Sequence, residues 1–175
     1  MSKDEKIEKT RDLVKRIKRA LGEENDVILD KLNELGCELR QNGQYEEAKE
    51  VHERCLAGRI KVLGEDHKNM LDTLNNLGNA YDNLGNYEKV LECFDRALKR
   101  NERNLGKNHP STLGAVANTA IVYDDTLKDY EKAEPLYQRA LEGYEAQLEK
   151  DHEDTMRDVP KTIENVLKRA EIAQD

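Results

Sequence analysis

The sequence predicts an all-α solenoid built from repeated pairs of helices, and three observations carry the prediction. A unit of 42 or 43 residues recurs along the chain. Within each unit the apolar residues follow the helical spacing of about 3.6 residues. The composition, 38% charged and 37% hydrophobic in 175 residues, is typical either of disorder or of a thin helical structure with much surface. The periodicity decides for the second.

The repeat is clearest at the tyrosine that begins the second helix of each unit. Tyr45, Tyr87 and Tyr130 begin the related segments YEEA, YEKV and YEKA, at spacings of 42 and 43 residues. The segment LGEDH at 63–67 returns as LGKNH at 105–109 and more weakly as LEKDH at 148–152. Because the pairs at 35–36, 77–78 and 119–120 keep regular steps of 42, we predict that the extra residue of the third unit lies in the loop 126–129.

Each unit is expected to contain two helices. The first helices are predicted at 27–42, 69–84 and 111–127, and the second helices at 45–62, 87–104 and 130–148. Asn69 and Ser111 are candidate N-caps, and Gly43 and Gly85 suit the left-handed residue that ends such a helix. Capping helices are predicted at 4–20 and 155–173, so that the whole chain, 1–175, forms a single domain of three full repeats (27–62, 69–104 and 111–148) and two caps.

The charge and the cysteines exclude several classes of protein. Lys and Arg number 29 against 37 Asp and Glu, a net charge of −8, which argues against nucleic-acid binding. No apolar run approaches the ~20 residues of a membrane span, and the charged N-terminus is not a secretory signal. Three cysteines, without a C-x-x-C pair, indicate free thiols in a reducing cytoplasmic setting.

The candidates for chemistry all have a structural interpretation. His67, His109 and His152 occupy equivalent turns of successive units, and helices pack about 8–10 Å apart, so these side chains cannot share one metal ion. They are expected instead to cap the next helix. His52 aligns with Phe94 and is predicted to be a packed core residue. We therefore expect no metal, no cofactor and no catalytic residue, and no phosphate-binding glycine motif is present.

The second unit resembles the tetratricopeptide repeat. Leu77 with Gly78, Tyr81, Val90, Phe94 and Ala97 fill the slots of that pattern. The longer period is similar to the variety found in kinesin light chains and nephrocystin-like proteins, as are the phrases LNNLGNAYDNLGNYEKV, LGKNHPSTL and YEKAEPLYQRALEGYE. The resemblance covers about 21–155. It implies a right-handed solenoid that acts as a non-catalytic protein-interaction module. The heptad region with which kinesin light chains bind their heavy chain is missing.

The same resemblance implies a concave groove lined by the first helices, in which an extended or helical peptide segment would bind. Side-chain amides both donate to and accept from a peptide backbone, and Asn76 and Asn118 occupy the slot from which related domains hold it. The carboxylates favour a basic or neutral segment over an acidic one. The groove residues predicted on this basis are Asn33, Asp72, Asn75, Asn76, Asn79, Asp82, Asn118 and Asp124.

Two alternatives stay open. In the first, the asparagines hydrogen-bond neighbouring helices and serve packing alone, and the acidic face is merely solvated. In the second, the chain is a structural spacer or a self-associating scaffold, natural or engineered, with no groove ligand. A monomer is predicted, with end-to-end association of the solenoid ends as the competing state. An enzyme would need a converged set of perturbed titratable groups, which the sequence does not offer.

Overall fold

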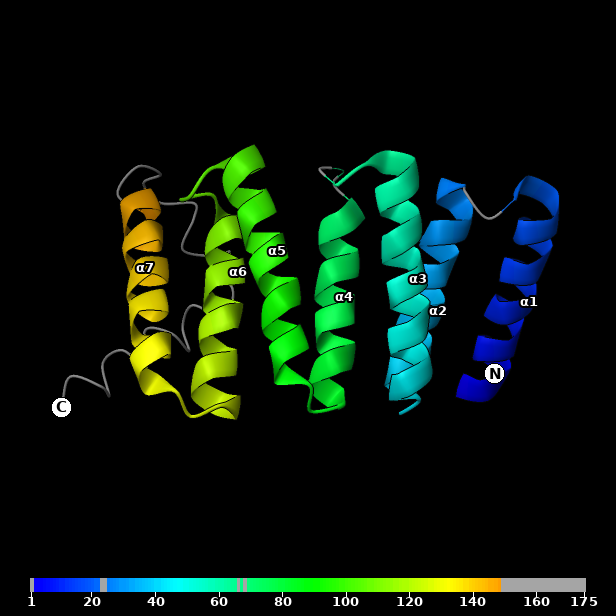
Figure 1. The fold of residues 1–175 in the computed structure, drawn as a ribbon, viewed down its shortest axis with the longest axis horizontal. Helices are drawn as coiled ribbons and strands as arrows, with labels where there is room; N and C mark the ends of the chain where they lie inside the picture. The colour runs from blue at the N-terminus through cyan, green and yellow to red at the C-terminus, as the bar shows by residue number, and fades with distance from the viewer. Residues whose placement is uncertain (1, 23–24, 66, 68, 149–175) are drawn as a thin grey trace. The chain divides into compact units, whose positions relative to one another are not determined.

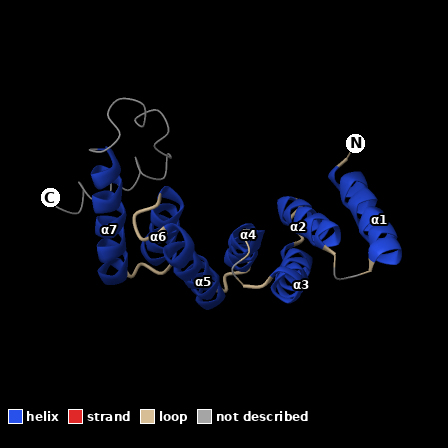
Figure 2. Cartoon of the chain, turned by 90° about the horizontal axis from the view of Figure 1, so that it is seen from above, coloured by secondary structure: helices blue, strands red, loops and turns tan. Residues whose placement is uncertain are grey.

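A computed structural model describes residues 2–22, 25–65, 67 and 69–148 of the chain (Figure 1). Every regular element in these residues is helical: seven α-helices and one π-helical turn (Figure 2). The chain divides into two compact units, 1–93 and 94–175, with the boundary inside α5 (Tyr87–Leu105), and each unit is described by itself. The capping helix predicted at 155–173 lies outside the described residues, and the single-domain organisation stays a prediction.

The first unit contains α1 (Lys3–Leu21), α2 (Asp26–Gln41), α3 (Tyr45–Leu63), α4 (Asn69–Asn83) and the beginning of α5. Helix α1 packs against α2, α2 packs against both α3 and α4, and α3 packs against α4. The bounds of these helices and of α5 lie within one residue of the predicted ones. Gly43 and Gly85 have φ values of 79° and 71°, as expected for the residue that ends the first helix of a pair.

The core of the first unit follows the predicted apolar stripes. The stripe of α3, Ala48, His52, Cys55 and Leu56, is buried in full. It packs with the apolar faces of α1 and α2, which contribute Ile7, Ile28, Leu29, Leu32, Leu35 and Leu39. Gly58 belongs to the same packing, because a methyl group on it would collide with the side chain of Leu29. The glycine inside α3 therefore permits a close approach of α2, which offsets its helix-propensity cost of about 1 kcal/mol.

The second unit contains the rest of α5, α6 (Pro110–Ile121), the π-helical turn η1 (Val122–Thr126) and α7 (Tyr130–Leu148). Helices α6 and α7 pack together. The buried residues of their shared core are four alanines with one valine and one tyrosine: Val116, Ala117 and Ala120 from α6, and Ala133, Tyr137 and Ala140 from α7.

The extra residue of the third repeat is absorbed by η1, and the prediction that it lies in the loop 126–129 is wrong. The Leu127 N–H donates to the Val122 carbonyl five residues earlier, at 3.0 Å, which is the π-helical pattern. A wider turn holds one more residue without breaking the helix. Lys128, at φ 55°, then takes the position that Gly43 and Gly85 fill in the other repeats.

Two histidines cap helices, as the repeat predicts. The Ser111 N–H donates to His109 Nδ1 at 3.2 Å, and the Asn69 N–H donates to His67 Nδ1 at 3.3 Å. His109 is therefore the N-cap of α6, and Ser111, the predicted cap, is already helical. Asn69 is likewise the first residue of α4 and not its cap. A histidine can fill this role because a neutral ring nitrogen accepts the free N–H of a first helical turn.

Candidate functional site

The structure brings together two of the predicted groove residues, Asn33 on α2 and Asn76 on α4. Asn76 Nδ2 donates to Asn33 Oδ1 at 3.2 Å, and both side chains are half-buried. Because α2 and α4 are the first helices of successive repeats, this bond joins the two repeats on the side where a groove is expected. The bond is also what the packing alternative requires, so the contact by itself does not choose between the two interpretations.

The other predicted residues of the first unit surround this pair with different exposures. Asn75 is half-buried, whereas Asp72, Asn79 and Asp82 are exposed on α4. Asp72 is among the carboxylates close enough to Cys37 on α2 to affect its pKa. The first unit thus carries exposed carboxylates beside a hydrogen-bonded pair of amides.

The second unit holds the last two predicted residues, which differ in setting. Asn118 is exposed on α6. Asp124 lies in η1, is half-buried, and accepts a hydrogen bond from Tyr137 Oη at 3.0 Å. Since Tyr137 belongs to the core of this unit, this hydrogen bond holds one carboxylate oxygen of Asp124 against the core. The widened turn alters the side-chain directions on which its groove position was based.

The sequence analysis missed a buried polar network centred on Arg59 of α3. The Arg59 side chain is 3% exposed, and its Nη1 donates to the Asn69 carbonyl and to Thr73 Oγ1, both at 2.5 Å. Its Nη2 donates to Asp30 Oδ1 at 2.5 Å. The guanidinium therefore ties the beginning of α4 to α2, and it neutralises a carboxylate on α2.

A signal for this network was present in the repeat. The positions equivalent to Arg59 are Asn101 and Tyr144, both of which carry a polar tip. Asn101 Nδ2 donates to the Ser111 carbonyl at 3.1 Å, and Tyr144 Oη donates to the Pro110 carbonyl at 3.2 Å. All three side chains reach a backbone carbonyl at the beginning of a first helix. Arg59 and Asn101 thereby reach the first helix of the next repeat, whereas Tyr144 reaches back to the first helix of its own repeat.

The cysteines and His52 have packing environments. Cys55 and Cys93 are buried, and Cys37 is half-buried. Burial raises the pKa of the Cys37 thiol, and nearby carboxylates add to that rise against the effect of Arg40. A thiol kept protonated is a poor nucleophile. Burial, helped by Arg40 and Arg59, lowers the pKa of His52 to about 4, so this side chain is a neutral core residue at pH 7.

Within the described residues no group of three or more His, Cys, Asp or Glu side chains could hold a metal ion. None of the helices in this part of the chain has the length and hydropathy to cross a membrane. The candidate site therefore consists of the amide and carboxylate side chains on first helices that are described above, on a helical-repeat protein.

The family model of the tetratricopeptide repeat matches residues 28–99 and 83–146. The chain therefore belongs to the tetratricopeptide repeat family. Repeats of this family generally mediate protein–protein interactions and are generally not catalytic. Among curated proteins, no sequence matches the chain.

Solved structures share the fold. A putative kinesin light chain from Podosopora anserina with nearly identical TPR-like repeats is 20% identical, with a TM-score of 0.75 over 98% of this chain and 87% of that chain. A variant of it is 23% identical, with a TM-score of 0.74 over 85% and 69%. BtubC (BKLC) from P. vanneervenii is 18% identical, with a TM-score of 0.64 over 85% and 64%. The likeness concerns the helical-repeat fold.

Proposed function

We propose that the chain is a non-catalytic adaptor that binds an extended or helical peptide segment on the polar face of its first helices. In the first unit this face carries Asn33, Asp72, Asn75, Asn76, Asn79 and Asp82. The repeat extends the proposal to the second unit, where Asn118 is exposed on α6 and Asp124 lies in η1. The three free thiols favour a reducing compartment such as the cytoplasm.

The observation that carries the proposal is the set of hydrogen-bonding groups that the bond between Asn76 and Asn33 leaves unused. In this pair Asn33 keeps both of its N–H groups, and Asn76 keeps its carbonyl oxygen as an acceptor. A donor and an acceptor held side by side match the C=O and N–H of one peptide unit. The mutual hydrogen bond restricts both side chains, which reduces the entropy lost when a peptide binds.

The charges of the same face favour a basic or neutral partner. Asp72 and Asp82 are both exposed on α4, and the carboxylate of Asp30 is already paired with Arg59. A lysine or arginine of a bound segment would meet complementary potential there, whereas an acidic segment would be repelled.

The test is a selection from a random-peptide display library on the folded protein, with counter-selection on Asn76→Ala/Asn118→Ala. We expect a shared motif rich in Lys or Arg, bound at least tenfold more weakly by the double variant. Asn104→Ala is the matched control, because Asn104 is an exposed asparagine on the second-type helix α5, and it should bind as the wild type does. Circular dichroism would verify that each variant is folded.

Cys37 offers a second readout of the same binding. It is the half-buried thiol of the three and lies on α2 near Asp72, whereas Cys55 and Cys93 are buried. A selected peptide bound on this face should slow the reaction of Cys37 with a maleimide. Failure to enrich any peptide from a folded, monomeric sample would refute the proposal and leave the spacer function. Size that grows with concentration in light scattering would favour the self-associating scaffold.

A further inference from the structure

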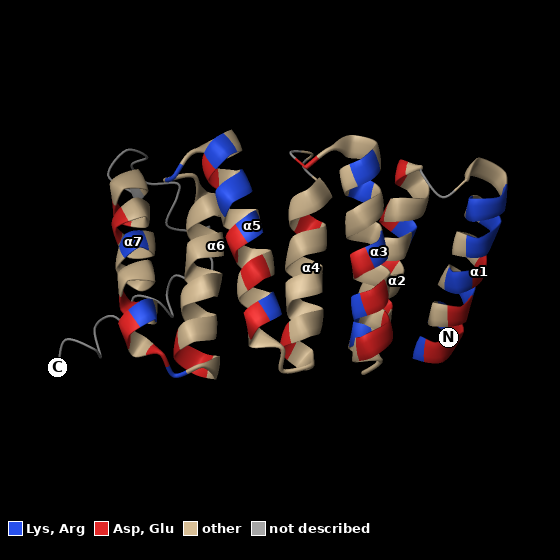
Figure 3. Ribbon diagram, in the orientation of Figure 1, with Lys and Arg blue, Asp and Glu red and all other residues tan. Residues whose placement is uncertain are grey.

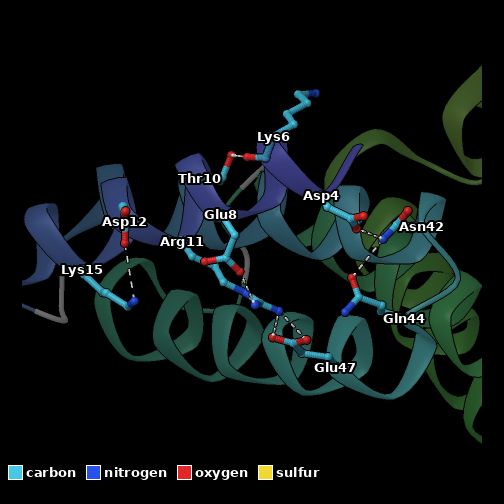
Figure 4. Close-up of polar contacts among 10 residues, drawn as sticks. All are labelled: Asp4, Lys6, Glu8, Thr10, Arg11, Asp12, Lys15, Asn42, Gln44 and Glu47. Atoms are coloured by element: carbon cyan, nitrogen blue, oxygen red, sulfur yellow. Dashed lines mark hydrogen bonds and ion pairs between the residues drawn. The ribbon is translucent and has the colours of Figure 1, made fainter. Parts of the chain in front are cut away.

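Helix α1 packs against α2, and its first half makes polar contacts with neighbouring elements of the first unit. Asn42 Nδ2 donates to Asp4 Oδ1 at 2.8 Å, and Arg11 pairs with Glu47 of α3 at 2.5 Å (Figure 4). Lys6 pairs with the buried Glu38 of α2 at 3.0 Å. Ile7 and Thr10 are the buried residues of α1. In the second half of the helix, Val14 and Ile17 are partly buried and pack against the core of the unit.

Three large apolar side chains are exposed where this second half meets α2. Leu13 is 38% exposed, Leu21 is 55% exposed, and Val27 in the first turn of α2 is 50% exposed. Leu13 and Leu21 lie one turn before and one turn after Ile17 on the same side of α1, and Val27 lies in the first turn of α2, the helix against which α1 packs. These side chains, Leu13, Leu21 and Val27, form what we call the N-terminal apolar strip.

The second half of α1 is basic. Lys15, Arg16, Lys18 and Arg19 follow Leu13 in α1, and no acidic residue occurs in this helix after Asp12. Figure 3 shows the basic residues gathered toward this end of α1. The whole helix has eight Lys and Arg against four Asp and Glu, in a chain whose net charge is −8. Arg16, three residues after Leu13, lies on the same side of the helix as that leucine.

Helix electrostatics explain only part of this arrangement. A basic last turn is favourable because it complements the partial negative charge at a helix C-terminus. A capping helix, however, is expected to have a polar outer face for solubility. Exposed leucines and a valine with Arg16 beside them are not explained by either requirement, but an apolar strip next to a cation suits an acidic, partly apolar partner.

We propose that the N-terminal apolar strip and Arg16 beside it dock an acidic amphipathic helix of a partner protein. The leucines and Val27 would cover its apolar side, and Arg16 would meet one of its carboxylates. A protein partner fits better than an anionic membrane, because the acidic chain as a whole would be repelled by such a surface. The proposal is independent of the groove, which favours the opposite charge in its ligand.

The experiment is a selection from a display library of amphipathic helical peptides. Their apolar positions are fixed as leucine, and their polar positions carry acidic, basic and neutral residues with equal frequency. We expect the selected pool to be enriched in Asp and Glu at the polar positions. Arg16→Glu and, separately, Leu13→Ser should each weaken binding of the pool about tenfold. Both side chains are exposed, so the variants should fold, which circular dichroism checks.

Two control variants separate this surface from a general charge effect and from the groove. Arg54→Glu makes the same charge change on an exposed position of α3 and should leave binding unchanged. Asn76→Ala/Asn118→Ala should also leave it unchanged, so that failure of the groove proposal is distinguishable from failure of this one. A pool without acidic enrichment, no enrichment at all, or binding insensitive to Arg16→Glu would overturn the proposal. Binding to phosphatidylcholine vesicles containing one quarter phosphatidylserine, lost in Arg16→Glu, would assign the surface to a membrane and overturn the protein partner.

Discussion

Replacing His52 with phenylalanine should remove a defined part of the pH dependence of stability. The His52 ring is fully buried against Gly36, where an added Cβ would lie 2.5 Å from Nε2. Within the described part of the chain, neither ring nitrogen has a hydrogen-bond partner. Burial is the main cause, and the charges of Arg40 and Arg59 are lesser causes, of a pKa lowered from 6.5 to about 4.

The sign and size of the effect follow from that pKa. Above pH 6.5 the imidazole is neutral in both the folded and the unfolded chain and does not penalise folding. As the pH falls below 6.5, His52 becomes protonated in the unfolded chain but stays neutral in the folded chain. The free energy of unfolding therefore falls until the pH reaches the folded pKa of about 4. Between pH 7.5 and pH 4.5 the loss amounts to about 2.5 kcal/mol, at about 1.4 kcal/mol for each pKa unit.

The assay is urea denaturation of the wild type and of His52→Phe across this pH range, followed by circular dichroism. Phenylalanine is suitable because Phe94 occupies the equivalent repeat position. Carboxylates titrate in both proteins, so their contribution cancels in the difference between the two free energies of unfolding. The free energy of unfolding of the variant should therefore rise by about 2.5 kcal/mol relative to that of the wild type as the pH falls from 7.5 to 4.5. His109→Asn, which keeps a good N-cap residue, controls for loss of a histidine outside the core. A difference that does not vary with pH would refute the reasoning.

Four further predictions concern single sites. Gly58→Ala should destabilise the protein by about 1–3 kcal/mol in urea titrations, because its methyl group collides with Leu29. Gly114→Ala, where the methyl group meets only ordinary contacts, should instead stabilise α6 by up to about 1 kcal/mol. Lys128→Gly should raise the melting temperature, since a non-glycine residue at φ 55° costs about 1–2 kcal/mol. Because burial raises the pKa of Cys37, its thiol should react at pH 8 more slowly than a free thiol, and urea should abolish the difference.

The helices were predictable because the same sequence pattern occurs three times along the chain. Tyr45, Tyr87 and Tyr130 mark the first residue of α3, α5 and α7 in the structure, as the sequence predicts. His52 could be assigned to the core because the same position holds Phe94 in the next unit. Comparing equivalent positions identifies a side chain that packs, even where its own chemistry would suggest another role.

The structure departs from the sequence-based prediction where one repeat differs from the others or where a contact joins two helices. The π-helical turn depends on which of several hydrogen-bonding patterns absorbs one more residue, and spacing alone does not distinguish a loop from a wider helical turn. The bond between Asn33 and Asn76 and the reach of Arg59 to Asp30 depend on the approach of two helices in space. The role of the predicted groove residues in binding stays a prediction that only a ligand can test.

The π-helical turn also bears on how such an array can change its length. The added residue is taken up before the left-handed position at Lys128, so the next helix still begins at its tyrosine, Tyr130. The spacing from the left-handed residue to the tyrosine that begins the second helix is therefore the same in units of 42 and 43 residues. Genetic duplication or exchange of units would preserve this junction even between copies of unequal length. A repeat gene of this kind can tolerate single-codon insertions inside a helix, where most folds would lose the register of everything that follows.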